Sequence, residues 1–269
     1  MKILVLGSGT AARHPDRSAP ACAAATGPAP QAERTHSAIA VSDDGERWVL
    51  LNASSDIGQQ LRATPALRPR ADGQRPIRAV VLMDAHIDHV AGLLALREGP
   101  PLTVVATPAV FEDLTTGLPL LNVLQGYCGV RWQALPVAGE CGRSDFVVPG
   151  VPGLAFAAFA VPGAAPPYSL HDGLEQPGDH IAVQVEDLRS GLRLFYAPGP
   201  VPRTGPVQAC MRGADRLLVD GSAWPEAAAT ARDPVGPRVL IHVQPPMPAP
   251  RAGAAAQVEL AYDGMEIEL

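Results

Sequence analysis

Hydrophobic residues occur in short runs along the chain, and most of these runs have the length of a strand. The stretches KILVLG, IRAVVLM, LTVVATP and RVLIHV are bounded by glycine, proline or polar residues, which is the pattern of buried β-strands. SAIAVSDD and RWVLLNAS predict a hairpin that turns at residues 43–46. Helical patterns are fewer: DIGQQLRATPAL predicts one helix, and the leucines of VAGLLALREG predict another.

These strand patterns form two runs with a few helices between them. Two sheets packed face to face with helices outside, an αββα sandwich of the α/β class, accommodate this order. We expect residues 1–269 to form a single domain, since no shift in composition marks a boundary, and the Ala- and Pro-rich stretches near 11–34 and 244–257 predict mobile loops. The terminal ELAYDGMEIEL predicts a closing strand on the sheet of the second half.

Composition narrows the class of protein. With 47% hydrophobic residues, a chain of 269 residues can fill its own core. The net charge of -6 and the absence of a basic stripe argue against nucleic acid as a partner. Four cysteines without CxxC or CxC spacing, and no apolar run near ~18 residues, favour a cytoplasmic protein without disulfides or membrane spans. The sequence leaves open whether the protein forms a homodimer.

The stretch MDAHIDHVAG, residues 83–92, concentrates polar side chains directly after a predicted buried strand. Side chains at the carboxyl end of such a strand lie on the rim of the sheet, where sites are commonly built. Asp84, His86 and Asp88 alternate along it and His89 follows. These residues could bind a metal, and the alternative is a polar surface turn.

Seven segments, in order and at matching intervals, resemble the PqqB family of pyrroloquinoline quinone biosynthesis, a branch of the metallo-β-lactamase fold: MKILVLGSG, WVLLNAS, DAHIDHVAGLLALREG, FYAPG, LLVDGS, IHV and AYDGMEIEL. The resemblance covers nearly the whole chain. The metal signature of the fold is H-x-H-x-D-H, and Asp84 stands here at its first histidine. The position of a later histidine ligand falls in VPGAAPPY, and SGLRLFYAPGP replaces a metal-bridging SGDT. The resemblance therefore implies one metal.

The ligand set implied by the resemblance is Asp88, His89 and His242. Two histidines and one carboxylate with open positions favour Fe(II) that activates dioxygen, and Zn(II) is the alternative. His86 is predicted to be a further ligand or a base, and Asp220 a catalytic residue. The alternatives are that His242 is a packed core residue and that Asp56 and Asp220 cap helices.

Other polar residues receive lesser roles. We interpret the remaining histidines as loop or packing residues: His14, His36, His171 and His180. Arg34 and His36 are also possible substrate contacts, because the resembling family carries R-x-x-S there. The cysteine cluster that binds a structural zinc in that family is reduced here to Cys22, so no such zinc is expected.

The resemblance implies a mononuclear oxygenase that hydroxylates a tyrosine-derived or other amino-acid or short-peptide substrate with dioxygen. The segment after the predicted His242 ligand reads QPPMP where the family has NNTNP, which suggests a changed substrate. A zinc-dependent hydrolase of the same fold is the first alternative, distinguished by two zinc ions instead of one iron. A catalytically silent binding or carrier protein is the second.

Overall fold

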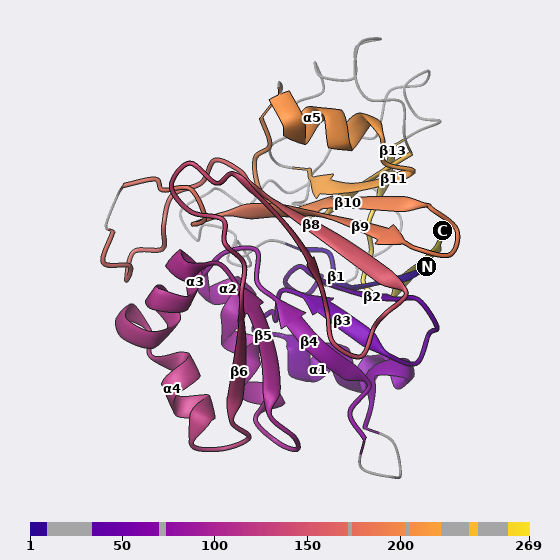
Figure 1. Cartoon of the computed structure of the whole chain (residues 1–269). Coiled ribbons are helices and arrows are strands. Elements are labelled where there is room, and N and C mark those ends of the chain that lie inside the picture. The colour runs from indigo at the N-terminus through magenta and orange to yellow at the C-terminus, as the bar shows by residue number, and fades with distance from the viewer. Residues whose placement is uncertain (10–33, 70–73, 172–173, 203–204, 222–236, 242–257) are drawn as a thin grey trace, which may run out of the picture.

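The structure is a computed structural model that describes residues 1–9, 34–69, 74–171, 174–202, 205–221, 237–241 and 258–269. In this part of the chain, two seven-stranded sheets face one another with helices on their outer sides (Figure 1). The predicted αββα sandwich is thus confirmed. The loops predicted near 11–34 and 244–257 lie outside the described residues, apart from Arg34.

The first sheet has the strand order β14-β1-β2-β3-β4-β5-β6. Its strands are β1 (Lys2–Gly7), β2 (Ala38–Ser42), β3 (Trp48–Leu51), β4 (Ile77–Val81), β5 (Leu102–Ala106), β6 (Val130–Ala134) and β14 (Met265–Glu268). β2 and β3 pair antiparallel, which confirms the predicted hairpin, and β3 to β6 are parallel. The carboxyl ends of these parallel strands therefore meet at one edge.

The second sheet has the order β13-β12-β11-β10-β9-β8-β7. Its strands are β7 (Arg143–Val147), β8 (Leu154–Ala160), β9 (Ile181–Asp187), β10 (Arg193–Ala197), β11 (Arg216–Asp220), β12 (Arg238–Ile241) and β13 (Val258–Leu260). β7 to β10 are antiparallel and β10 to β13 parallel. β7 was not predicted, because its charged and half-exposed residues lack an apolar pattern.

Helices cover both outer faces (Figure 1). The first sheet is covered by α1 (Ile57–Ala63), η1 (Pro65–Leu67), α2 (Ile87–Val90), η2 (Ala91–Leu96), α3 (Pro108–Glu112), η3 (Asp113–Gly117) and α4 (Leu120–Gln125), and the second by α5 (Gly205–Arg212). One apolar cluster fills the space between the sheets and two others lie under the helices. Strands buried on both faces need near-continuous apolar runs, which explains the sequence pattern. No helix among the described residues is long and apolar enough to cross a membrane.

The carboxyl-terminal segment joins both sheets, which corrects the expected closing strand. β13 belongs to the second sheet, as predicted, but β14 pairs antiparallel with β1 in the first. Between them Gly264 has a φ of 84° and donates its N–H to the carbonyl of Val5. The positive φ, which glycine adopts readily, turns the chain from one sheet to the other. In the sequence, these two short strands have the pattern of a single strand.

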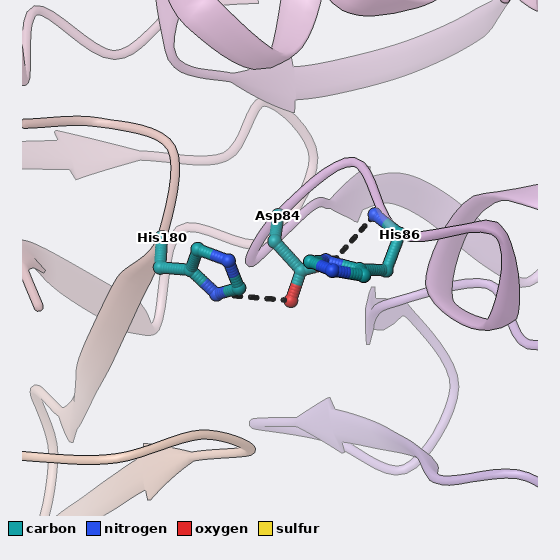
Figure 2. A group of neighbouring side chains, drawn as sticks. All are labelled: Asp84, His86 and His180. Carbon is teal, nitrogen blue, oxygen red and sulfur yellow. Dashed lines mark hydrogen bonds and ion pairs between the residues drawn. The ribbon is translucent and has the colours of Figure 1, made fainter. Parts of the chain in front are cut away.

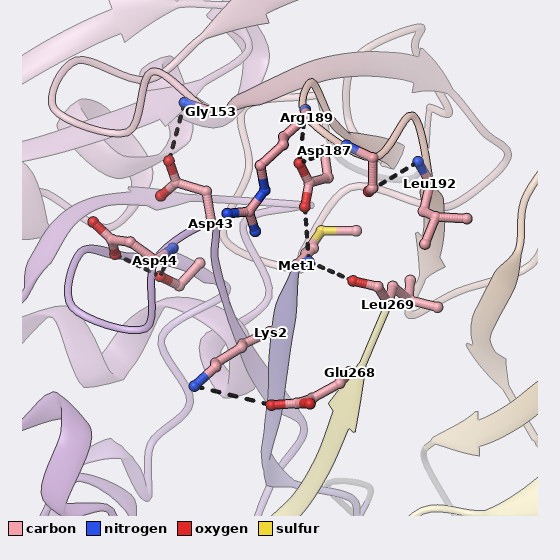
Figure 3. Close-up of polar contacts among 12 residues, drawn as sticks. Met1, Lys2, Asp43, Asp44, Gly153, Asp187, Arg189, Leu192, Glu268 and Leu269 are labelled. Atoms are coloured by element: carbon pink, nitrogen blue, oxygen red, sulfur yellow. Dashed lines mark hydrogen bonds and ion pairs between the residues drawn. The ribbon is translucent and has the colours of Figure 1, made fainter.

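A buried ion pair joins the two sheets at Asp187, the carboxyl end of β9. The Met1 ammonium donates to Asp187 Oδ2 at 2.8 Å and to the carbonyl of Leu269 at 2.5 Å (Figure 3). Burial would raise the pKa of Asp187, but the hydrogen bond from the ammonium and those from nearby backbone N–H groups lower it to about 2. The carboxylate is therefore ionised at neutral pH.

Candidate metal centre

The loop between β4 and α2 is held in place by the loop that follows β3. Asn52 has a left-handed φ of 67°, and its Oδ1 accepts the N–H of Met83 at 2.9 Å. Ala53 donates to the carbonyl of His89 at 2.8 Å and accepts from the N–H of Gly92 at 3.0 Å. A Cβ on Gly92 would overlap this backbone, so only glycine permits the close approach. The motif is therefore presented at the rim of the sheet.

Asp84 is the buried carboxylate at the centre of the motif, with 2% of its surface exposed. It accepts the backbone N–H of His86 at 2.9 Å, and its oxygens lie 2.7 and 2.8 Å from His89 Nδ1. Burial alone would raise the pKa of Asp84, but the charge of His89 and hydrogen bonds from His86 and His89 outweigh it and hold the pKa well below its ordinary value. Asp84 therefore remains ionised.

Two further imidazoles face this carboxylate (Figure 2). His86 Nδ1 lies 3.5 Å from one oxygen of Asp84, and His180 Nδ1 lies 3.6 Å from the other. One ligand atom from each of these three residues falls within 4.8 Å of the others. Two nitrogen donors and a carboxylate oxygen suit iron or zinc. The hydrogen bond with Asp84 raises the pKa of His86 against the effect of burial.

The orientation of His180 also suits metal binding. Its Nε2 lies 2.9 Å from the carbonyl of Ala164. A carbonyl only accepts, so Nε2 carries the proton and the lone pair of Nδ1 points toward Asp84. Such an outer hydrogen bond is the usual way in which a protein orients a metal-binding histidine. A Cβ on Gly163 would overlap the His180 ring, so this glycine makes room for it.

The connection from β8 to β9 is tied by one contact to the motif and by another to Thr107, the residue after β5. The Tyr168 hydroxyl donates to the carbonyl of Ala85, and Thr107 Oγ1 donates to the carbonyl of Gly178 at 2.6 Å. Burial, and then the nearby carboxylates of Asp113 and Asp84, raise the pKa of Tyr168. The phenol therefore stays protonated as a donor and carries the segment before His180 onto the motif.

Asp88 and His89 are adjacent but have different partners. His89 contacts Asp84, whereas Asp88 Oδ1 lies 3.8 Å from His36 Nε2. The second sheet contributes Asp220, which is buried at the end of β11. Burial raises the pKa of Tyr196, as do the charges of Asp84 and Asp220.

The predicted ligand set is therefore only partly described. His242 directly follows β12 and lies outside the described residues, so the grouping of Asp88, His89 and His242 stays a prediction. His86, predicted as a ligand or base, does belong to the assembled group. His180 was missed as a candidate. Its one signal in the sequence was its place immediately before an apolar strand, in GDHIAVQV.

Comparison with known proteins identifies the family. Residues 47–261 match the model of a beta-lactamase superfamily domain. "Coenzyme PQQ synthesis protein B" of Methylococcus capsulatus is 42% identical, and the match covers 88% of each chain. The chain belongs to the PqqB family. The protein of the same description from Azoarcus sp. is 41% identical and is matched over 100% of both chains.

Solved structures agree with membership of the PqqB family. A crystal structure of Zn(2+)-bound PqqB from Methylobacterium extorquens matches with a TM-score of 0.78 and 31% identity, over 100% of both chains. A diphosphatase of the PhnP family matches with a TM-score of 0.66 and 19% identity, which shows the shared fold alone. The resemblance predicted from sequence is thus confirmed.

Proposed function

We propose that this PqqB-family chain is a metal-dependent oxygenase that uses Fe(II) and dioxygen to hydroxylate a tyrosine-derived or other amino-acid or short-peptide substrate. The group of Asp84, His86 and His180 carries this proposal. Two histidines and one carboxylate with open positions are the donor set of non-haem Fe(II) oxygenases. The names of the relatives support a place in biosynthesis of the PQQ cofactor or a related small molecule, and the zinc-bound relative supports a transition metal.

The residues of this chain have distinct parts in the proposal. A bound iron would supply the activation of dioxygen. Asp84 brings a negative charge that offsets part of the charge of the metal ion, since its pKa is held well below the ordinary value. His180 is oriented by the carbonyl of Ala164, and the contact with His89 Nδ1 holds the carboxylate of Asp84 in place. Burial of Asp84 keeps bulk water from its oxygens and strengthens these electrostatic contacts.

The proposal is tested by oxygenation under controlled metal content. The apoprotein is loaded anaerobically with Fe(II), exposed to dioxygen with tyrosine and short tyrosine-containing peptides, and the products are analysed by mass spectrometry. We expect a product that carries added oxygen from the unaltered chain and from the control His171→Gln, but not from His180→Gln. His171 suits the control because it pairs with Glu112 at 3.4 Å instead of with Asp84. Absence of any oxidised product would overturn the proposal.

Zinc-dependent hydrolysis is the second candidate. It is favoured by the position of Asp88 and His36, which offer donors next to the Asp84 group, because hydrolases of this fold generally use a fuller ligand set. Zinc would lower the pKa of a bound water for attack on an ester or phosphodiester. Turnover of such substrates by the zinc-loaded chain, together with no oxygenation by the iron-loaded chain, would favour this candidate.

A further inference from the structure

A cavity of about 600 Å³ lies at the end of the sandwich where β9 finishes. Turns of both sheets form its wall: Asp43 comes from the turn between β2 and β3, Gly153 directly precedes β8, and Arg189 follows β9 (Figure 3). The volume is in the range of small-molecule sites. His180 precedes the other end of β9, whose seven residues span roughly 23 Å. The cavity is therefore separate from the candidate metal centre.

Hydrogen bonds hold the turns around the cavity together. Asp43 Oδ2 accepts the N–H of Gly153 at 3.1 Å, and a Cβ on Gly153 would overlap Asp43, so this approach requires glycine. The carbonyl of Gly153 accepts the N–H of Leu188 at 2.9 Å. Asp187 Oδ1 accepts the N–H of Arg189, also at 2.9 Å. The side chains of Asp43 and Arg189 are therefore presented by turns that are fixed to one another.

Two of the carboxylates on the wall already have cationic partners. Asp187 binds the Met1 ammonium at 2.8 Å (Figure 3). Asp44 binds the guanidinium of Arg47 at 2.6 Å. The charges of these two carboxylates are therefore balanced within the protein, and they do not attract a cationic ligand strongly.

Two opposite charges on the wall lack such partners. The guanidinium of Arg189 makes no hydrogen bond or ion pair with another described residue, and Asp43 Oδ1 has no hydrogen-bond partner among them. Nearby, Lys2 Nζ and Glu268 Oε1 are 3.9 Å apart, which is beyond hydrogen-bond length. The wall therefore offers two cations and two anions whose charges are incompletely balanced.

This set of charges favours a ligand that carries both signs. An anion would be repelled by the carboxylates of Asp43 and Glu268, and a cation would be repelled by Arg189 and Lys2. A ligand with an ammonium and a carboxylate can place each end against the opposite charge. A guanidinium such as that of Arg189 binds a carboxylate through two parallel hydrogen bonds.

We propose that this cavity binds a zwitterion, either a free amino acid or a short peptide with free ends, whose carboxylate is bound by Arg189 and whose ammonium is bound by Asp43. Lys2 and Glu268 add one charge of each sign to the same wall. The cavity shares no residue with the candidate metal centre. The inference is therefore independent of the proposed function.

Calorimetric titration of the full chain with leucine and with glycylleucine tests the proposal. Arg189→Gln and Asp43→Asn are compared with the control Arg193→Gln, which removes an arginine that pairs with Glu186 at 3.0 Å and does not line the cavity. We expect a probe that binds the unaltered chain to bind Arg193→Gln equally, and each cavity variant at least about tenfold more weakly. The tighter probe shows whether the ligand is an amino acid or a peptide.

Blocked probes test whether both charges of the ligand are needed. The N-acetyl form of each probe lacks the ammonium, and the amide form lacks the carboxylate. Each blocked form should bind the unaltered chain at least about tenfold more weakly than the free probe. Blocked forms that bind as tightly as the free probes would overturn the assignment of a zwitterion.

A variant of the metal centre shows where the probes bind. His180→Gln should bind them as the unaltered chain does, and melting curves show whether each variant is folded. Loss of binding by folded His180→Gln would place the probes at the metal centre and overturn the inference. Equal binding by the folded cavity variants and the unaltered chain, or no binding of either probe by the unaltered chain, would also overturn it. None of these results would decide the proposed function.

Discussion

Replacing Asp84 with asparagine should abolish tight metal binding while preserving the shape of the side chain. Asp84 contributes an ionised oxygen to the assembled group and also holds His89 at 2.7 Å and the backbone N–H of His86 at 2.9 Å. Loss of a residue that only supports a metal ligand typically weakens metal binding about 10–100-fold. Because Asp84 is itself placed as a ligand, we expect a loss of at least about 100-fold, which is about 2.7 kcal/mol.

Competition with a chromophoric chelator for Zn(II) at neutral pH measures this loss. The control is Asp145→Asn, which removes an exposed carboxylate paired with Arg143 at 2.8 Å. That control should bind zinc like the unaltered chain. Equal zinc affinity of folded Asp84→Asn and the unaltered chain would refute the placement of Asp84 among the ligands.

Two further changes test other parts of the structure. Gly163→Ala should weaken Zn(II) binding by about tenfold, because the added Cβ must displace the His180 ring. The control is Gly142→Ala, whose added Cβ meets no atom within 4 Å. Equal zinc affinities of these two variants would contradict the placement of His180. Asp187→Asn should lower the free energy of unfolding at pH 7 by about 3 kcal/mol, since it leaves the Met1 ammonium buried without its carboxylate partner. The stabilisation by Asp187 is fully present above its ordinary pKa of 3.8 and is lost as the pH falls toward about 2. Denaturant unfolding of Asp187→Asn and of the unaltered chain should therefore give converging free energies of unfolding near pH 2. A difference that does not change with pH would contradict the ion pair as the source of the stabilisation.

Most of the fold could be predicted because the strands have a simple local signature. Segments such as IRAVVLM and LTVVATP are buried on both faces, so apolar residues occupy consecutive positions in them and not only alternate ones. β7 escaped prediction because it is largely exposed and contains Arg143 and Asp145. The destination of β14 depends on pairing with β1, at the opposite end of the sequence. Local pattern carries no information on such a pairing.

The site was predictable only where its residues are close in sequence. Asp84, His86, Asp88 and His89 share one loop, so strand-end position and alternation were enough to select them. His180 reaches the same carboxylate from the other sheet, and the space left by Gly163 decides where its ring can lie. The expectation of a missing first-metal ligand considered only the aligned position in VPGAAPPY. His180, which lies farther along the chain, joins Asp84 and His86 instead.

Elemental analysis of the freshly purified protein, in parallel with His180→Gln and His171→Gln, tests the central claim most directly. The account predicts iron bound to the unaltered chain and to His171→Gln at the same ratio, and a clear loss of iron from His180→Gln. Iron retained equally by all three folded proteins would contradict a metal centre built on Asp84, His86 and His180.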